Sequence, residues 1–219
     1  RCSTHCVSAW RVIEASRRIM SQRKARWWLR IPLMLIGLFL LVQIWFFAWV
    51  MVWRVSEPGP TQFMKIRLAE LQKKNPHARL QQYWVPYGQI SGNLKRALIA
   101  AEDSKFMQHT GFDFDGIQKA LEKNEKRGRI AAGGSTITQQ LAKNLFLWPE
   151  KSLIRKGQEA LITLMIEATW NKRRILEVYM NEIEWGTGIF GAEAAARNYF
   201  GVSADNQNEN QAAMIASMV

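Results

Sequence analysis

Two neighbouring carboxylates, Glu102 and Asp103, are the first residues of this sequence whose type and position suggest chemistry. They end an apolar helical repeat that begins at Leu94. At about 100° per residue, the repeat predicts Glu102 at the edge of the apolar face and Asp103 facing away from it. A carboxylate beside apolar side chains holds its proton more tightly than one in water, which suits a general base. The alternative is an ordinary glutamate at the boundary of a helix face.

Residues 133–144, GGSTITQQLAKN, combine two glycines with hydroxyl, amide and cationic side chains. Thr136 and Gln139 have capping-box spacing, so a helix is expected to begin at Ser135 or Thr136. The unpaired N–H groups of a first helical turn bind anions. The alternative is a capped helix with a solvated polar face, and a P-loop is excluded because Gly-Lys-Ser/Thr does not follow at the required spacing. The polar side chains expected to share one face are Gln140, Lys143 and Asn144.

A third cluster places Arg155, Lys156 and Glu159 within five residues. Arg155 and Glu159 are four residues apart, so the simplest interpretation is an exposed ion pair that contributes a few tenths of a kcal/mol, roughly 0.3–0.5 at best. The functional interpretation is a cationic fork for a phosphate group beside a second acidic residue. The pattern of this cluster alone favours the exposed ion pair.

Residues 31–53 form an uncharged apolar run of 23 residues. As a helix the run is about 34 Å long, enough to cross a hydrocarbon core of about 30 Å. Trp27, Trp28, Trp49 and Trp53 lie near its ends, where indole rings suit the membrane interface. A buried core helix and a cleaved signal peptide are the alternatives, but the run is long and no small-residue cleavage site follows it. We therefore predict a single-pass transmembrane helix.

The segment before this run is strongly basic. Residues 1–30 carry eight Lys/Arg and one acid, so the positive-inside rule places the N-terminus in the cytoplasm and residues 54–219 outside it. Met20 opens a plausible basic lead-in, and residues 1–19 are expected to be non-native. No metal site is predicted from the few scattered ligand-type residues, which are Cys2, His5, Cys6, His77 and His109.

Composition supports a folded protein with an anionic partner or surface. Hydrophobic residues make up 48% of the chain and charged residues 22%, which excludes a disordered or fibrous protein as the main state. The net charge of +12 is the reason to expect an anionic partner or surface. With only two cysteines the chain is not a disulfide scaffold. From residue 92 on the pattern is helical, and no alternating stretch is long enough for a real sheet, so we predict a mainly α fold. The expected helices after the membrane span lie near 63–74, from about 94, from 135 or 136, and at 152–170, 172–181, 190–200 and 209–219.

The order and spacing of these blocks resemble the family 51 glycosyltransferases, which polymerise peptidoglycan. Glu102, Asp103, Phe106, His109 and Gly111 match the family's first block. The second and third blocks match residues 133–144 and 155–159, and the fourth matches Lys172, Ile175, Leu176, Glu177, Tyr179 and Asn181. The family continues past Val219, so the catalytic domain is expected to be truncated. The predicted division is a basic segment 1–30, a transmembrane helix 31–53, a linker 54–82 and a glycosyltransferase domain 83–219.

The resemblance implies a lysozyme-like helical domain that joins lipid II units into β-1,4 glycan by inverting displacement of undecaprenyl pyrophosphate. It implies that Glu102 is the base for the acceptor 4-hydroxyl and that Glu159 is a second catalytic acid of undecided role. No cofactor is expected to be required, and a divalent cation such as Mg²⁺ is left open. The implied substrate-binding residues are Ser135, Gln139, Gln140, Lys143, Asn144, Arg155 and Lys156.

The expected location is the bacterial inner membrane with the catalytic domain in the periplasm. Expected partners are lipid II, the growing glycan, membrane lipid, transpeptidases and divisome proteins, and no nucleic acid is expected. Phe112, Phe114 and Ile117 either form an apolar flank that meets lipid tails or belong to the core. Two other functions are considered: a membrane-bound lytic enzyme, which has no need for Lys143 and Arg155 as a pyrophosphate cradle, and a non-catalytic cell-wall assembly factor.

Overall fold

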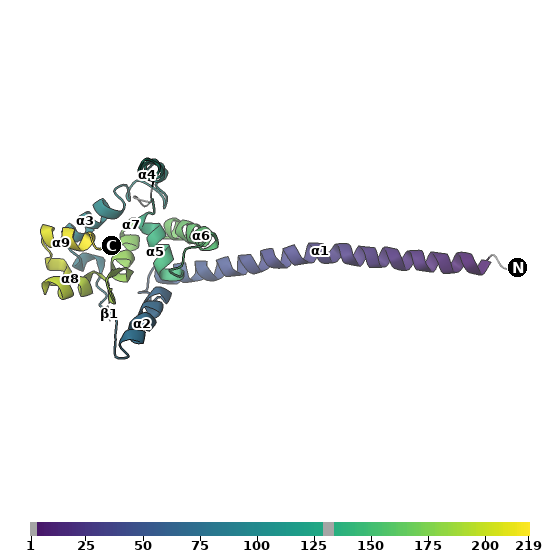
Figure 1. Ribbon diagram of the computed structural model, residues 1–219, viewed down its shortest axis with the longest axis horizontal. Coiled ribbons are helices and arrows are strands. Elements are labelled where there is room, and N and C mark those ends of the chain that lie inside the picture. The colour runs from purple at the N-terminus through teal and green to yellow at the C-terminus, as the bar shows by residue number, and fades with distance from the viewer. Residues whose placement is uncertain (1–3, 129–133) are drawn as a thin grey trace. The chain divides into compact units, whose positions relative to one another are not determined.

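The computed structural model describes residues 4–128 and 134–219 (Figure 1). Cys2 and Gly133 therefore lie outside the described residues, as do the side chains of His5 and Cys6. The described chain divides into two units, one that ends at Phe46 and one that comprises Phe47–Val219. The candidate site lies entirely in the second unit.

The N-terminal helix α1 runs over Thr4–Trp53, so it includes residues 4–30 of the basic segment as well as the predicted span. Its part Arg30–Trp53 is long and apolar enough to cross a membrane, and only 6% of an 18-residue stretch within it is buried. Such low burial disfavours the alternative of a soluble core helix, because a core helix hides its apolar side chains from solvent.

The second unit is mainly helical, as the sequence predicts. Among the described residues, seven of its helices begin at a polar residue whose side chain accepts a hydrogen bond from a backbone N–H in the first turn. These cap residues are Thr61, Ser91, Asp113, Thr136, Ser152, Asn171 and Asn208. The helices after α1 are α2 (Gln62–Lys74), α3 (Gly92–Glu102), α4 (Phe114–Arg127), α5 (Ile137–Phe146), α6 (Leu153–Thr169), α7 (Lys172–Glu182), α8 (Ala192–Phe200) and α9 (Glu209–Ala216), with short 3-10 turns at η1 (Tyr87–Gln89) and η2 (Ala204–Asn206).

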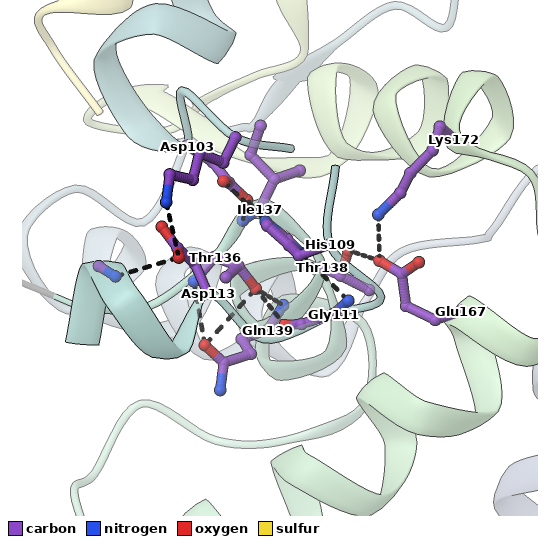
Figure 2. Close-up of polar contacts among 12 residues, drawn as sticks. Asp103, His109, Gly111, Asp113, Thr136, Ile137, Thr138, Gln139, Glu167 and Lys172 are labelled. Carbon is purple, nitrogen blue, oxygen red and sulfur yellow. Dashed lines mark hydrogen bonds and ion pairs between the residues drawn. The ribbon is translucent and has the colours of Figure 1, made fainter. Parts of the chain in front are cut away.

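Helix α5 lies at the centre of this unit and packs against α6 and α7 (Figure 1). Ile137, Leu141 and Leu145 form its apolar face and are buried. Thr138 Oγ1 donates to Glu167 Oε1 at 2.5 Å, and Lys172 Nζ contacts the same oxygen at 2.8 Å (Figure 2). These bonds join α5 to α6 and to the start of α7, so the polar face of α5 is held in a fixed orientation.

A small sheet is present that the sequence analysis did not predict. Strands β1 (Gln81–Gln82), β2 (Glu184–Gly186) and β3 (Ile189–Phe190) lie in the order β1-β3-β2. β1 pairs with β3 in parallel, and β2 pairs with β3 in antiparallel register. The expectation of no sheet was wrong because strands of two or three residues are too short to produce a visible alternation.

Candidate active site

Two adjoining cavities lie around the N-terminal half of α5. The first, here the base cavity, has a volume of about 160 Å³ and is lined by residues that include Glu102, Asp113 and Ser135. The second, here the cationic cavity, has a volume of about 260 Å³ and is lined by Ser135, Gln139, Gln140, Lys143, Pro149, Lys151, Arg155, Lys156 and Glu159. Because Ser135 lines both cavities, the two are neighbours across a single residue.

Glu102 is the last residue of α3 and is half-buried in the wall of the base cavity. Gln140 Nε2 donates to its Oε2 at 2.7 Å. Oε1 of Glu102 has no hydrogen-bond partner among the residues that the structure describes. Within the described part of the chain, the carboxylate is therefore held through Oε2 alone.

Asp103 does not face away, as the helical repeat predicts, but is buried at 7% exposure. Helix α3 ends at Glu102, and Asp103 is its C-cap with extended backbone (φ −160°), so the 100° step no longer applies there. Its carboxylate accepts from the backbone N–H of Ile137 at 3.1 Å and contacts His109 Nε2 at 2.8 Å (Figure 2). Because Gly111 N–H donates to His109 Nδ1 at 3.2 Å, the proton on Nε2 is the one donated to Asp103.

The predicted capping box is present at the start of α5. Gln139 N–H donates to Thr136 Oγ1 at 3.3 Å, and Thr136 N–H donates to Gln139 Oε1 at 3.0 Å (Figure 2). Thr136 Oγ1 also donates to the Gly111 carbonyl at 2.7 Å. The side-chain amide oxygen Oε1 of Gln139 therefore caps the beginning of the helix, although Gln139 still lines the cationic cavity.

In the third cluster Arg155 and Glu159 are buried, so they do not form the exposed ion pair that their spacing alone favoured, whereas Lys156 is exposed. Arg155 is 7% and Glu159 2% exposed, and Arg155 Nη1 donates to Glu159 Oε2 at 2.9 Å. Lys156 Nζ bonds Glu159 Oε1 and donates to Ser135 Oγ at 3.4 Å. Arg155 Nε is buried with no hydrogen-bond partner among the described residues. A buried N–H donor without a partner is costly in free energy, so this atom is suited to meet an anionic ligand.

Lys143 brings a further positive charge to the cationic cavity. Burial lowers the pKa of Lys143, and Arg155 and Lys156 lower it further, whereas Glu159 and Glu102 raise it. With Lys151 included, four cationic side chains line this cavity against one carboxylate. An anion that entered it would meet a net positive and partly desolvated surface, where electrostatic attraction is stronger than in water.

The structure brings together nearly every residue that the sequence analysis assigned to the site. Glu102 lines the base cavity, and Ser135, Gln139, Gln140, Lys143, Arg155, Lys156 and Glu159 line the cationic cavity. Asn144 is buried and is not among the lining residues of either cavity. Tyr179, which belongs to the fourth block but was given no role, contacts Gln140. The i, i+3, i+4 rule works within one helix, and it carries no signal for a contact from another helix.

A helical domain that sets a carboxylate beside a cationic cavity has the parts of an enzyme that transfers a glycosyl group from a phosphate leaving group. The chain belongs to the transglycosylase family, whose model matches residues 68–219. It is 62% identical over 193 residues to the biosynthetic peptidoglycan transglycosylase of Dechloromonas aromatica (strain RCB), covering 88% of this chain and 84% of that relative. The protein of the same name from Azoarcus sp. (strain BH72) is 59% identical over 194 residues, covering 89% and 84%. The enzyme is thus a glycosyltransferase with the expected lysozyme-like helical fold.

Proposed function

We propose that this chain is a peptidoglycan glycosyltransferase that polymerises lipid II into β-1,4 glycan strands. The name shared by its relatives supports this substrate. The observation that carries the proposal is the adjacency of the two cavities, which share Ser135 and set Glu102 near Lys143. A base and an anion-binding surface side by side are what a displacement of pyrophosphate by a sugar hydroxyl requires.

In the proposed reaction the acceptor 4-hydroxyl attacks the anomeric carbon of the donor. The new O4–C1 bond forms as the bond from C1 to the pyrophosphate oxygen breaks, and the electron pair of that bond leaves with the pyrophosphate. Glu102 takes the proton of the hydroxyl at Oε1, the oxygen that Gln140 does not bond. Attack from the face opposite the leaving group inverts an α-linked donor and gives the β-1,4 bond.

The departing pyrophosphate is proposed to bind in the cationic cavity. Arg155 offers its unpartnered Nε, and Lys143, Lys151 and Lys156 add positive charge around the developing anion. Hydrogen bonds between cationic donors and phosphate oxygens are about twice as strong as neutral ones. Removal of a single donor of this type costs an enzyme about 10²–10³ in kcat.

Glu159 is proposed to organise the cations and not to touch the reacting atoms. Its two oxygens are bonded separately to Arg155 Nη1 and Lys156 Nζ. A metal ion at Glu159 would have to displace at least one of these cations, so the donor set does not fit a divalent cation there. We therefore propose that Arg155 and Lys156 supply the charge that Mg²⁺ supplies in many phosphate-transfer sites.

The proposed location is the inner membrane, with α1 as the anchor and the catalytic unit in the periplasm. The apolar length of Arg30–Trp53 supports the anchor, and the basic segment before it supports this orientation. Phe114 is 74% exposed and stacks on Phe112 with ring centroids 6.0 Å apart. The core alternative is therefore wrong for Phe114, and we propose that this pair meets lipid tails. Transpeptidases and divisome proteins stay proposed partners, because cross-linking needs a separate active site.

The decisive experiment supplies the detergent-solubilised chain with radiolabelled lipid II and separates the products by size. Growth of polymer that depends on Glu102 is expected, and Glu102→Gln is expected to abolish it. Shortening of preformed glycan strands without polymer growth would instead identify a lytic enzyme. Binding of lipid II with no turnover by the unsubstituted chain would favour a non-catalytic assembly factor.

A further inference from the structure

A continuous hydrogen-bonded chain links the core of the domain to Glu102. Tyr179 Oη donates to Gln140 Oε1 at 2.8 Å, and Gln140 Nε2 donates to Glu102 Oε2 at 2.7 Å. The three side chains come from α7, α5 and α3 in turn. We refer to Tyr179, Gln140 and Glu102 as the relay.

The direction of the relay depends on both of its ends. An ionised carboxylate only accepts hydrogen bonds, so Gln140 bonds Glu102 only when its NH₂ group is turned toward that carboxylate. Its carbonyl oxygen then points the other way, toward Tyr179, and needs a donor there. A phenol O–H supplies that donor, whereas a phenylalanine at this position would leave the carbonyl oxygen without a partner.

Tyr179 is well placed to hold this direction. Its side chain is fully buried at 0% exposure. Burial raises the pKa of the Tyr179 phenol, and the negative charges of Glu102 and Asp103 raise it further, so the O–H keeps its proton at every pH at which the enzyme works. A rotamer that is locked by surrounding atoms positions a functional group more narrowly than one on the surface.

The orientation of the Gln140 amide is not fixed by the shape of its own side chain. It is half-buried, lines the cationic cavity, and its amide oxygen and nitrogen are nearly equal in size. If the amide turned by 180°, its carbonyl oxygen would face the carboxylate of Glu102. The two oxygens would repel one another, and Glu102 would move from its position in the wall of the base cavity.

We propose that Tyr179 is a positioning residue for catalysis, which sets the amide of Gln140 so that Glu102 keeps Oε2 occupied and presents Oε1 alone to the acceptor hydroxyl. The inference rests on the proposed function, since it assigns the atom of Glu102 that acts as base. It assigns Tyr179 no contact with substrate. Tyr179 acts on the reaction only through Gln140.

The test measures polymerisation kinetics of the full chain with Tyr179→Phe. A fall in kcat of about 10-fold is expected, because a general base contributes about 10²–10⁴-fold and a misplaced base retains part of that. The KM for lipid II is expected to change less than twofold, because the phenol touches no substrate. Tyr199→Phe is the matched control: Tyr199 Oη also donates to a carbonyl, that of Trp185 at 3.2 Å, but lies outside the relay.

A double-mutant cycle separates positioning from a plain structural role. Gln140→Met keeps the approximate side-chain length and removes both the donor and the acceptor. In this background Tyr179→Phe is expected to have no further effect on kcat, whereas a structural contribution would persist and multiply. If Tyr179→Phe does not fold, Gln140→Met alone tests the relay: a fall in kcat of about 10-fold with the KM for lipid II changed less than twofold supports it. Because Gln140 also lines the cationic cavity, a rise in KM with unchanged kcat would instead assign Gln140 to substrate binding and overturn the relay.

The outcomes distinguish the inference from the function on which it rests. If Glu102→Gln abolishes polymerisation while Tyr179→Phe matches Tyr199→Phe in kcat, the positioning role is wrong and the proposed function stands. Equal losses from Tyr179→Phe with and without Gln140→Met would also overturn the positioning role. If Glu102→Gln polymerises normally, the proposed mechanism fails first.

Discussion

Asp103 Oδ2 accepts a hydrogen bond from the backbone N–H of Ile137 at 3.1 Å, and this bond joins the end of α3 to the beginning of α5 (Figure 2). Glu102 precedes Asp103 directly, and Gln140 lies one turn beyond Ile137. The same bond that caps α5 therefore sets the distance between the proposed base and its hydrogen-bond donor. A negative charge at a helix N-terminus is also stabilised by the helix dipole.

Replacing Asp103 tests this connection. The Asp103 carboxylate accepts hydrogen bonds from His109 Nε2 and from the backbone N–H of Ile137. Asp103→Asn keeps the shape of the side chain but replaces one accepting oxygen with an NH₂ group that cannot accept. A loss of about 1–3 kcal/mol in the free energy of unfolding is expected. Polymerisation is expected to fall as well, because the Glu102–Gln140 distance depends on Asp103. Thermal unfolding and product length measure the two effects. Asp115→Asn is the matched control, since Asp115 is exposed and bonds only Lys105 among the described residues; equal effects of both substitutions would contradict this role of Asp103.

The buried carboxyl group of Glu182 is expected to make the stability of the fold depend on pH. Burial raises its pKa to about 9 against an ordinary 4.5, while a hydrogen bond from Gln82 lowers it in part. Its Oε2 has no partner within the described part of the chain. The folded state holds this proton more tightly than the unfolded state. The contribution of Glu182 to the free energy of unfolding is therefore fully present below about pH 4.5 and is lost as the pH rises toward 9.

The measurement is thermal unfolding of Glu182→Gln between pH 5 and pH 9. The neutral amide has no proton to lose, so its Tm is expected to fall less over this range than that of the unsubstituted chain. Glu122→Gln is the control, because Glu122 is exposed and bonds Gln118. If Glu182→Gln and the unsubstituted chain lose Tm in parallel, Glu182 is not the group responsible.

Much of this architecture could be predicted from residue patterns. The apolar span, the capping box at Thr136 and the helices after residue 150 follow from local periodicity and cap chemistry, which act over a few residues. Asp103 shows where such reasoning stops. One residue beyond the end of α3, the backbone turns and buries the side chain, and no local pattern marks that turn.

The relay shows a second limit. Tyr179 and Gln140 are 39 residues apart, and their contact depends on how α7 packs against α5. Likewise, the spacing of Arg155 and Glu159 predicts that they pair, but only the packing of α6 decides that the pair is buried. In both cases the chemistry depends on which side chains are buried between packed helices. The residue periodicity of a single helix does not predict how that helix packs against others.

Arg155 is the residue whose loss is expected to affect leaving-group departure most. Arg155→Lys keeps a charge but loses the fork and the unpartnered Nε, so a fall in kcat of about 10²–10³ is expected. Arg197→Lys is the control: Arg197 also bonds a glutamate four residues away, at 2.5 Å, but its side chain is largely exposed. Single-turnover kinetics with lipid II measure both, and comparable rates for the two variants would exclude Arg155 from the pyrophosphate site.

Phe114 tests the proposed contact with lipid tails. Its ring is exposed, and solvation of a ring of this size costs about 2 kcal/mol that burial in lipid would recover. Phe114→Ser is therefore expected to raise the KM for lipid II severalfold when the full chain is reconstituted in vesicles, and to change it little in detergent micelles that supply substrate without a continuous bilayer. Met214→Ser removes a similarly exposed apolar side chain from α9 and is expected to be silent in both. If Phe114→Ser has the same KM as the unsubstituted chain in vesicles, the Phe112–Phe114 pair does not meet the membrane, and some other exposed apolar side chains of the domain must do so.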